Sequence, residues 1–122
     1  MITEWFRRLV NKLETADLYE MANISTNRTG LPVTVFCSPK GRAKHECRVK
    51  VSNIKGGINE YDVFSISVKD LSIEGYCKLS SDDLETVRWW IHRNRFAILD
   101  FWKERLDTLE FLQELKPITK EE

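Results

Sequence analysis

The stretch CSPKGRAKHECRVKV, residues 37–51, contains two cysteines, one of the two histidines of the chain and five basic residues. Together with Cys77, its thiols and the imidazole of His45 could in principle form a tetrahedral zinc shell. Structural zinc sites usually hold two ligands in one local turn, whereas Cys37 and Cys77 would have to arrive from separate segments. We therefore expect no metal, no cofactor and three reduced thiols that behave as small apolar residues.

The same stretch could pair a nucleophilic cysteine with His45 as its base. Such a pair normally needs a third group that orients the base and a site for the developing oxyanion, and no motif in the sequence marks either. The acidic residues are numerous but dispersed, so no two of them stand out as a general acid and base. We expect no catalytic residues and no enzymatic activity, with a small toxin-like nuclease that depends on His45 as an alternative.

Cations dominate the loop SPKGRAKHE and the residues that follow it. With one glycine, the loop is unlike a phosphate-cradling loop, and a solvated hairpin tip is the simplest interpretation. It could instead form a binding edge for a phosphate group or an acidic protein, because Arg48 and Lys50 alternate with Val49 and Val51 and so share one face of a strand. The expected contacts, which we call the basic strip, are Lys40, Arg42, Lys44, Arg48 and Lys50.

The charge of the chain is balanced overall but uneven along its length. Residues 28–57 hold seven Lys and Arg against a single acid, Glu46, while residues 58–122 hold nine Lys and Arg against fourteen acids. A net charge of zero argues against a general nucleic-acid binder, whose affinity depends on neutralising many phosphates. A local basic strip could still contact an acidic partner.

The elements that must position these residues follow from the hydrophobic pattern. Residues 1–20 show helical spacing of apolar side chains, and from residue 22 short β-branched runs alternate with loops rich in Gly, Pro and Lys. The loops are too short for helical crossovers, so the strands should pair antiparallel. The expected strands cover residues 31–37, 47–54 and 61–68, with a fourth short strand at 75–79.

A long amphipathic helix is expected after the sheet. The serines and acids of SSDDLE, from residue 80, offer an N-cap and negative charge for a first turn. Asp107, with Glu110 three residues later, indicates a second cap and a short final helix. The stripe of the long helix that should face the core consists of Leu84, Val87, Ile91, Asn94, Ile98 and Trp102.

These elements predict a single α+β domain over residues 1–116. An antiparallel sheet of three to four strands (22–79) packs against the long C-terminal helix, with an added N-terminal helix (1–20), a short final helix within 80–116 and a flexible tail at 117–122. No apolar run reaches the roughly 20 residues of a membrane span, and the N-terminus lacks the unbroken apolar core of a signal peptide. A cytoplasmic protein is therefore expected.

Two large rings fall on the side of the long helix opposite its core stripe. Trp89 and Phe96 are seven residues apart, and Arg93 lies between them. The N-terminal or the C-terminal helix could cover the two rings. Alternatively, the three residues could form an interface with a protein partner or with a second copy of the chain, because aromatic residues and Arg are enriched at such interfaces.

The segments NRTGLPVTVF and AKHECRVKVSN resemble a group of small uncharacterised bacterial and prophage proteins. Those proteins have an R-T-G-L-P segment followed by a K-H-x-x-R-[IV]-K-V strand, and they continue into a sheet and a helix. Cys47 stands where that group is expected to have proline. The resemblance implies a bacterial or phage cytosolic setting and carries no established activity. The matching residues here are 28–32, 44–45 and 48–51.

We therefore expect a non-enzymatic protein-interaction module, an accessory protein of a phage or mobile element that acts on a host or neighbouring protein. A nucleic-acid-binding protein that uses the basic strip, within residues 40–50, is the alternative. A protein partner is expected to bind at the basic strip or at Trp89 and Phe96, where a homodimer could also form, and no membrane partner is expected.

Overall fold

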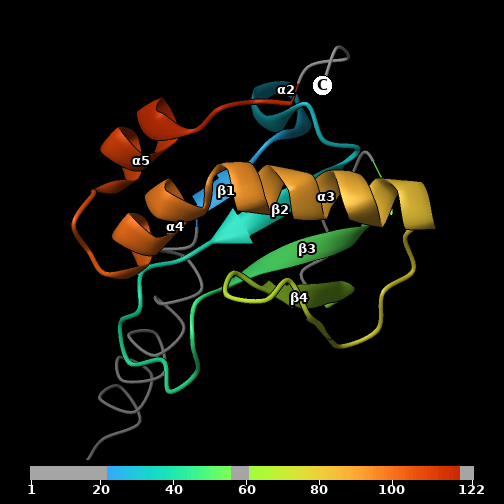
Figure 1. The fold of residues 1–122 in the computed structure, drawn as a ribbon, viewed down its shortest axis with the longest axis horizontal. Coiled ribbons are helices and arrows are strands. Elements are labelled where there is room, and N and C mark those ends of the chain that lie inside the picture. The colour runs from blue at the N-terminus through green and yellow to red at the C-terminus, as the bar shows by residue number, and fades with distance from the viewer. Residues whose placement is uncertain (1–21, 56–60, 119–122) are drawn as a thin grey trace, which may run out of the picture.

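The computed structural model describes residues 22–55 and 61–118, and the helix expected over 1–20 lies outside them. In this part of the chain, five strands form one antiparallel sheet in which neighbours in sequence are neighbours in space (Figure 1). An α+β fold with an antiparallel sheet is thus confirmed, with five strands where three or four were expected. The strands are β1 (Ala22–Ile24), β2 (Val33–Cys37), β3 (Arg48–Lys55), β4 (Val63–Ser67) and β5 (Ile73–Glu74).

The sheet differs from the prediction at its two edges. The three residues of β1 are too few to show a period in the sequence, and they pair with β2. The strand expected at 75–79 is wrong, because the pairing with β4 is made by Ile73 and Glu74. Gly75 then adopts a φ of 101°, a conformation that ends the strand.

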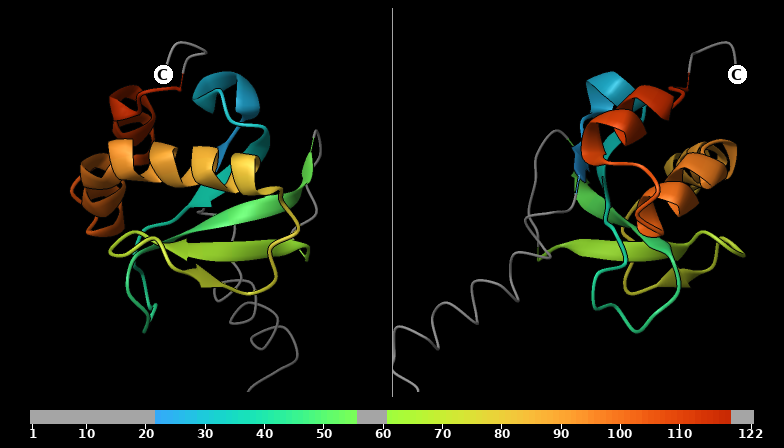
Figure 2. Two further views of the ribbon diagram at one scale, coloured as in Figure 1. Left: turned by 45° about the vertical axis from the view of Figure 1, so that its right-hand side comes forward. Right: turned by 90° about the vertical axis from the view of Figure 1, so that its left-hand side faces the viewer.

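One face of the sheet carries the core. In β3, Val49 and Val51 are buried, while Arg48 and Lys50 are only partly buried, so the predicted alternation of faces is confirmed. The helices pack against the face that carries Val49 and Val51 (Figure 2). The largest fully buried side chains of this core include Phe64, Ile66, Trp90, Ile91, Ile98 and Phe111.

Both predicted helix starts after the sheet are confirmed. The side chain of Ser80 accepts a hydrogen bond from the backbone N–H of Asp83 at 3.2 Å, and Asp107 forms a capping box with Glu110. In the described ranges, no helix is long and apolar enough to span a membrane. The helices are α2 (Thr26–Thr29), α3 (Ser81–Arg93), α4 (Arg95–Trp102) and α5 (Thr108–Glu114).

The long helix expected after residue 80 is divided into α3 and α4 at Asn94, where φ is −104° and ψ is 14°. The buried Asn94 side chain donates to the carbonyls of Trp90 and Lys116, both at 3.0 Å, and accepts from the backbone N–H of Lys116 at 2.7 Å. Asn94 therefore joins the end of α3 to the segment that follows α5, and α4 continues in a different direction (Figure 1).

The C-terminal part of the described chain is fastened at two further points. The rings of Phe101 and Phe111 stack with centroids 4.3 Å apart, which holds α5 against α4. The backbone N–H of Ile118 donates to the carbonyl of Thr29 at 2.8 Å, beside Gly30, whose φ is 77°. Ile118 belongs to the expected tail, whose last residues, 119–122, lie outside the described ranges.

Candidate functional site

The loop between β2 and β3 carries Lys40, Arg42 and Lys44, all of them exposed. The backbone N–H of Ala43 donates to the carbonyl of Lys40 at 2.8 Å and closes a turn at the loop tip. The backbone N–H of Lys40 donates to the carbonyl of Trp102 at 2.8 Å. The three cations of the basic strip thus lie on a loop that is tethered to the end of α4.

The other two cations of the basic strip, Arg48 and Lys50, lie on β3 and point away from the core. Arg48 forms an ion pair with Glu74 of β5, and 25% of its side chain is exposed. Its charge is therefore already compensated. The structure divides the basic strip into an exposed loop group and a sheet group, and it does not present five unpaired cations along one edge.

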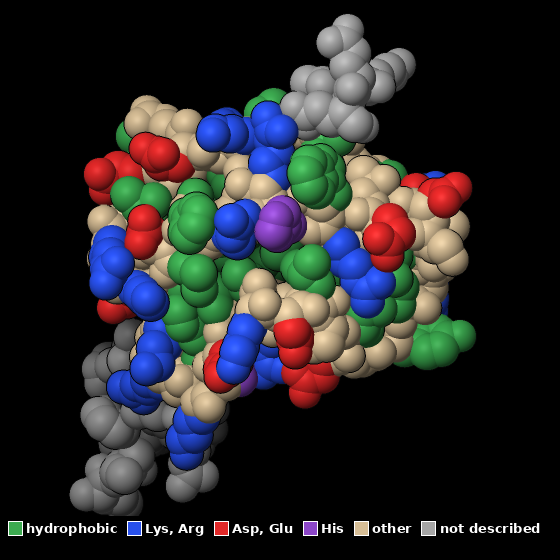
Figure 3. Space-filling view, in the orientation of Figure 1, with side chains coloured by type: hydrophobic (Ala, Val, Ile, Leu, Met, Phe, Trp, Pro, Cys, Tyr) green, Lys and Arg blue, Asp and Glu red, His purple; other side chains and the backbone are tan. Residues whose placement is uncertain are grey.

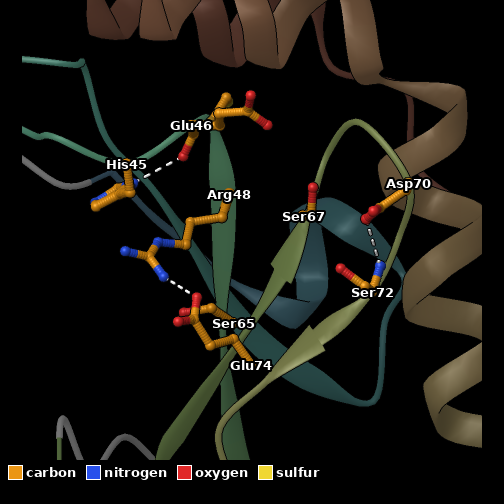
Figure 4. Close-up of a pocket in the computed structure, with 9 residues that line it drawn as sticks. His45, Glu46, Arg48, Ser65, Ser67, Asp70, Ser72 and Glu74 are labelled. Carbon is orange, nitrogen blue, oxygen red and sulfur yellow. Dashed lines mark hydrogen bonds and ion pairs between the residues drawn. The ribbon is translucent and has the colours of Figure 1, made fainter.

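A polar pocket of about 280 Å³ lies between this loop and strands β3, β4 and β5 (Figure 4). Arg48 and Glu74 lie on one side of it, and the turn that contains Asp70 and Ser72 lies on the other. Hydrogen bonds from Ser72 lower the pKa of Asp70, whose carboxylate accepts from the backbone N–H of Ser72 at 3.0 Å. Asp70 therefore serves to stabilise the turn.

The thiols of this region are protonated at neutral pH. Burial raises the pKa of Cys47 to about 12, against a smaller opposing effect of Lys103, and burial also raises the pKa of Cys37. The ring of His45 is hydrogen-bonded to the carbonyl of Glu46 at 2.7 Å. In residues 22–55 and 61–118, no three His, Cys, Asp or Glu side chains cluster as metal ligands would. The polar pocket offers hydrogen-bonding groups and the ion pair of Arg48 and Glu74.

Trp89 and Phe96 are exposed on the outer side of α3 and α4, together with Arg93. The exposed fraction is 47% for Trp89 and 68% for Phe96, so the described part of the chain does not cover either ring. Hydrophobic and basic side chains gather over these two helices on the face shown in Figure 3. Within residues 22–55 and 61–118, the predicted interface residues therefore lie on the surface.

Neighbouring side chains hold the two rings in place. The ring of His92 stacks on that of Trp89, with centroids 5.9 Å apart and planes inclined by 27°. Arg95 places its guanidinium carbon 4.5 Å from the centroid of Phe96 and donates to the carbonyl of His92 at 2.7 Å. Trp89, His92, Arg95 and Phe96 thus form one connected group, which we call the aromatic surface.

His92 and Arg95 were absent from the predicted interface. Their spacing could have indicated them, because residues three apart are neighbours on a helix surface, and the steps from Trp89 to His92 and from His92 to Arg95 are both of three residues. Arg95 is adjacent to Phe96 in sequence and reaches its ring at the first turn of α4, just after the break at Asn94.

The acids closest in sequence to the aromatic surface are already paired within the chain. Glu85 accepts from Arg88 at 3.0 Å, and Asp100 lies 3.5 Å from Arg105. The guanidinium group of Arg95 lies over one of the two exposed rings. The electrostatic character of the aromatic surface is therefore basic, which favours a partner that carries acids.

Comparison of the chain with protein-family models, with curated proteins and with solved structures finds no match. Function is therefore inferred from the geometry of the polar pocket, the basic strip and the aromatic surface.

Proposed function

We propose that the chain is a non-enzymatic protein-interaction module, an accessory protein of a phage or mobile element, whose aromatic surface binds an acidic segment of a host or neighbouring protein. The observation that carries this proposal is the exposure of Trp89 and Phe96, at 47% and 68%. Covering apolar surface stabilises a complex by about 25 cal/mol per Å² before the costs of association. Aromatic and Arg side chains are also the residues that most often dominate binding energy.

The aromatic surface is preorganised for this role. The stacking of His92 on Trp89 and the contact of Arg95 with Phe96 restrict the rotamers of both rings before a partner arrives. A side chain that is already ordered loses less conformational entropy on binding, and each such side chain otherwise costs about 0.5 to 1.5 kcal/mol.

A second copy of this chain fits the aromatic surface less well than an acidic segment does. In a two-fold dimer the same patch faces itself, so Arg95 of one copy would approach Arg95 of the other. The acids nearest in sequence that could compensate this charge, Glu85 and Asp100, are engaged by Arg88 and Arg105. An acidic segment with apolar side chains meets the rings and the cations without this repulsion.

A peptide-display selection against the full chain tests the proposal. The expected outcome is enrichment of peptides that combine Asp or Glu with Phe, Leu or Trp. Their binding should weaken about 30-fold, or about 2 kcal/mol, in the Trp89→Ala/Phe96→Ala variant. Tyr76→Ala is the matched control, because Tyr76 is 75% exposed and lies outside the aromatic surface.

Three outcomes would contradict this assignment. Enriched peptides that bind the double variant as tightly as the wild type would place the binding site elsewhere. A wild-type dimer in light scattering that dissociates in the double variant would assign the aromatic surface to self-association. Binding of a single-stranded DNA oligonucleotide that weakens steeply with salt and is lost in Lys40→Ala/Arg42→Ala would favour the nucleic-acid alternative at the basic strip.

A further inference from the structure

A second pocket, of about 450 Å³, lies between the β2–β3 loop, the turn after β4 and the end of α4. Cys47, Leu99 and Trp102 supply its apolar wall. The ring of His45 lies beside that wall, with its centroid 5.4 Å from the ring of Trp102 and the planes inclined by 33°. Both the volume and the combination of an apolar wall with a few polar groups are typical of small-molecule sites.

Three lysines from different segments surround this pocket. Lys40 comes from the loop, Lys69 from the turn after β4 and Lys103 from the residue that follows α4. Within the described ranges none of them forms an ion pair, and Glu46 is the one acid that lines the pocket. Basic side chains gather around hydrophobic surface at the lower left of Figure 3, below α4.

Lys103 acts electrostatically on Cys47, which forms part of the pocket wall. Burial raises the pKa of Cys47 to about 12, and the ammonium group of Lys103 acts on this thiol in the opposite direction. Several cations around one opening with low-dielectric walls raise the local concentration of anions. Lysine side chains also rotate freely enough to converge on an anionic group at the centre of the opening.

We infer that this site, which we call the lysine pocket, binds a small organic anion that has a flat apolar body and one carboxylate or phosphate group. The flat body lies against Leu99 and Trp102, and the anionic group lies among the three ammonium groups. An inorganic ion would leave the apolar wall in water, and a neutral aromatic molecule would leave the lysines without a counter-charge. The lysine pocket shares no residue with the aromatic surface, so the two proposals are independent.

NMR titration of the ¹⁵N-labelled full chain tests the inference with four probes. Benzoate and phenyl phosphate carry both features of the ligand, benzamide carries only the flat body, and inorganic phosphate carries only the charge. We expect benzoate and phenyl phosphate to shift the indole N–H signal of Trp102 and the amide signals of Cys47 and Lys69 in a saturable manner. Benzamide and inorganic phosphate should bind about ten-fold more weakly.

Two lysine variants locate the anionic group. Lys69→Met and Lys103→Met keep an unbranched side chain and remove the charge, and each should weaken phenyl phosphate binding about ten-fold. Lys44→Met, in the β2–β3 loop that borders the pocket, is the matched control, because Lys44 is exposed and does not line the pocket. The inference is overturned by equal affinity of benzamide and benzoate, by unchanged affinity in both lysine variants, or by the absence of saturable shifts with every probe.

Discussion

Replacing Asn94 by alanine should destabilise the fold by about 2 to 3 kcal/mol, because the side chain makes three hydrogen bonds that are each worth about 1 kcal/mol. Two of them are donated, to the carbonyls of Trp90 and Lys116 at 3.0 Å, and one is accepted from the backbone N–H of Lys116 at 2.7 Å. Asn94 itself is 3% exposed, so water does not reach the truncated site easily.

The backbone groups that lose Asn94 as a hydrogen-bond partner set the upper limit of the destabilisation. The carbonyl of Trp90 keeps the hydrogen bond from the backbone N–H of Asn94 at 3.0 Å, so it retains one partner. The N–H and carbonyl of Lys116 lose their Asn94 partner, but they are only partly buried and can be solvated after a small displacement. A fully buried unpaired group would add about 1 to 3 kcal/mol, and that penalty is largely avoided here.

Thermal and urea unfolding measure the change. For a chain of 122 residues, a loss of 2 to 3 kcal/mol corresponds to a fall in Tm of about 8 to 12 °C. Gln113→Ala, at an exposed position of α5, is the control and should change stability by less than about 0.5 kcal/mol. Asn94→Asp should be no more stable than Asn94→Ala, because a carboxylate cannot donate to the carbonyls of Trp90 and Lys116.

Hydrogen exchange distinguishes a local effect from a global one. In Asn94→Ala the backbone amides of Lys116 and Ile118 should exchange faster than the rest of the chain, because the C-terminal segment loses its attachment to the helix break. If Asn94→Ala were as stable as Gln113→Ala, or if these amides exchanged at the wild-type rate, the role assigned to Asn94 would be refuted.

Three further changes test the fold independently. Gly30→Ala should destabilise by about 2 kcal/mol in urea unfolding, because φ is 77° and a Cβ would collide with the carbonyl of Ile118; unchanged stability would mean that the C-terminal contact is not maintained in solution. Asp107→Ala should cost about 1 kcal/mol through loss of the capping box, seen as a Tm lower by about 4 °C, and a change below 1 °C would contradict the cap. The hydrogen bonds from Lys78 and Asn53 lower the pKa of Asp62, so this carboxylate stabilises the fold above its unfolded-state pKa, and the contribution is lost as the pH falls through the folded value. Asp62→Asn should therefore flatten the decline of Tm below about pH 4, and an unaltered decline would be evidence against the interaction.

Much of the fold could be predicted because its signals are local. Alternation in β3 separated buried Val49 and Val51 from the cations between them, and serine and aspartate caps marked the starts of α3 and α5. The break between α3 and α4 could not be placed in this way, because Asn94 fits the periodic stripe and is indeed buried. Its partner Lys116 lies 22 residues further along the chain. A buried amide must still find hydrogen-bond partners, so an asparagine in an apolar stripe is itself a signal for such a contact.

The aromatic surface was predictable only in part, for a related reason. Periodicity placed Trp89 and Phe96 opposite the core stripe without any knowledge of the tertiary structure. The same periodicity describes α3 and α4 as one straight helix. It therefore cannot show that Arg95, the first residue of α4, lies over the ring of Phe96 and donates a hydrogen bond to the carbonyl of His92. Side-chain contacts across a helix break depend on the angle of that break, which local pattern does not encode.

No pattern in the sequence indicates the lysine pocket, because its cations become neighbours only through the topology of the fold. Lys40, Lys69 and Lys103 are 29 and 34 residues apart, and the last two belong to the half of the chain in which acids outnumber basic residues. The fold brings the turn after β4 and the end of α4 to the β2–β3 loop and so collects, at one opening, three charges that form no ion pair among the described residues. The same topology has the opposite effect on Arg48, whose charge is compensated by Glu74 from β5. Charge counted along the chain thus overstates the basic strip and misses the lysine pocket, since electrostatic potential depends on distances in space.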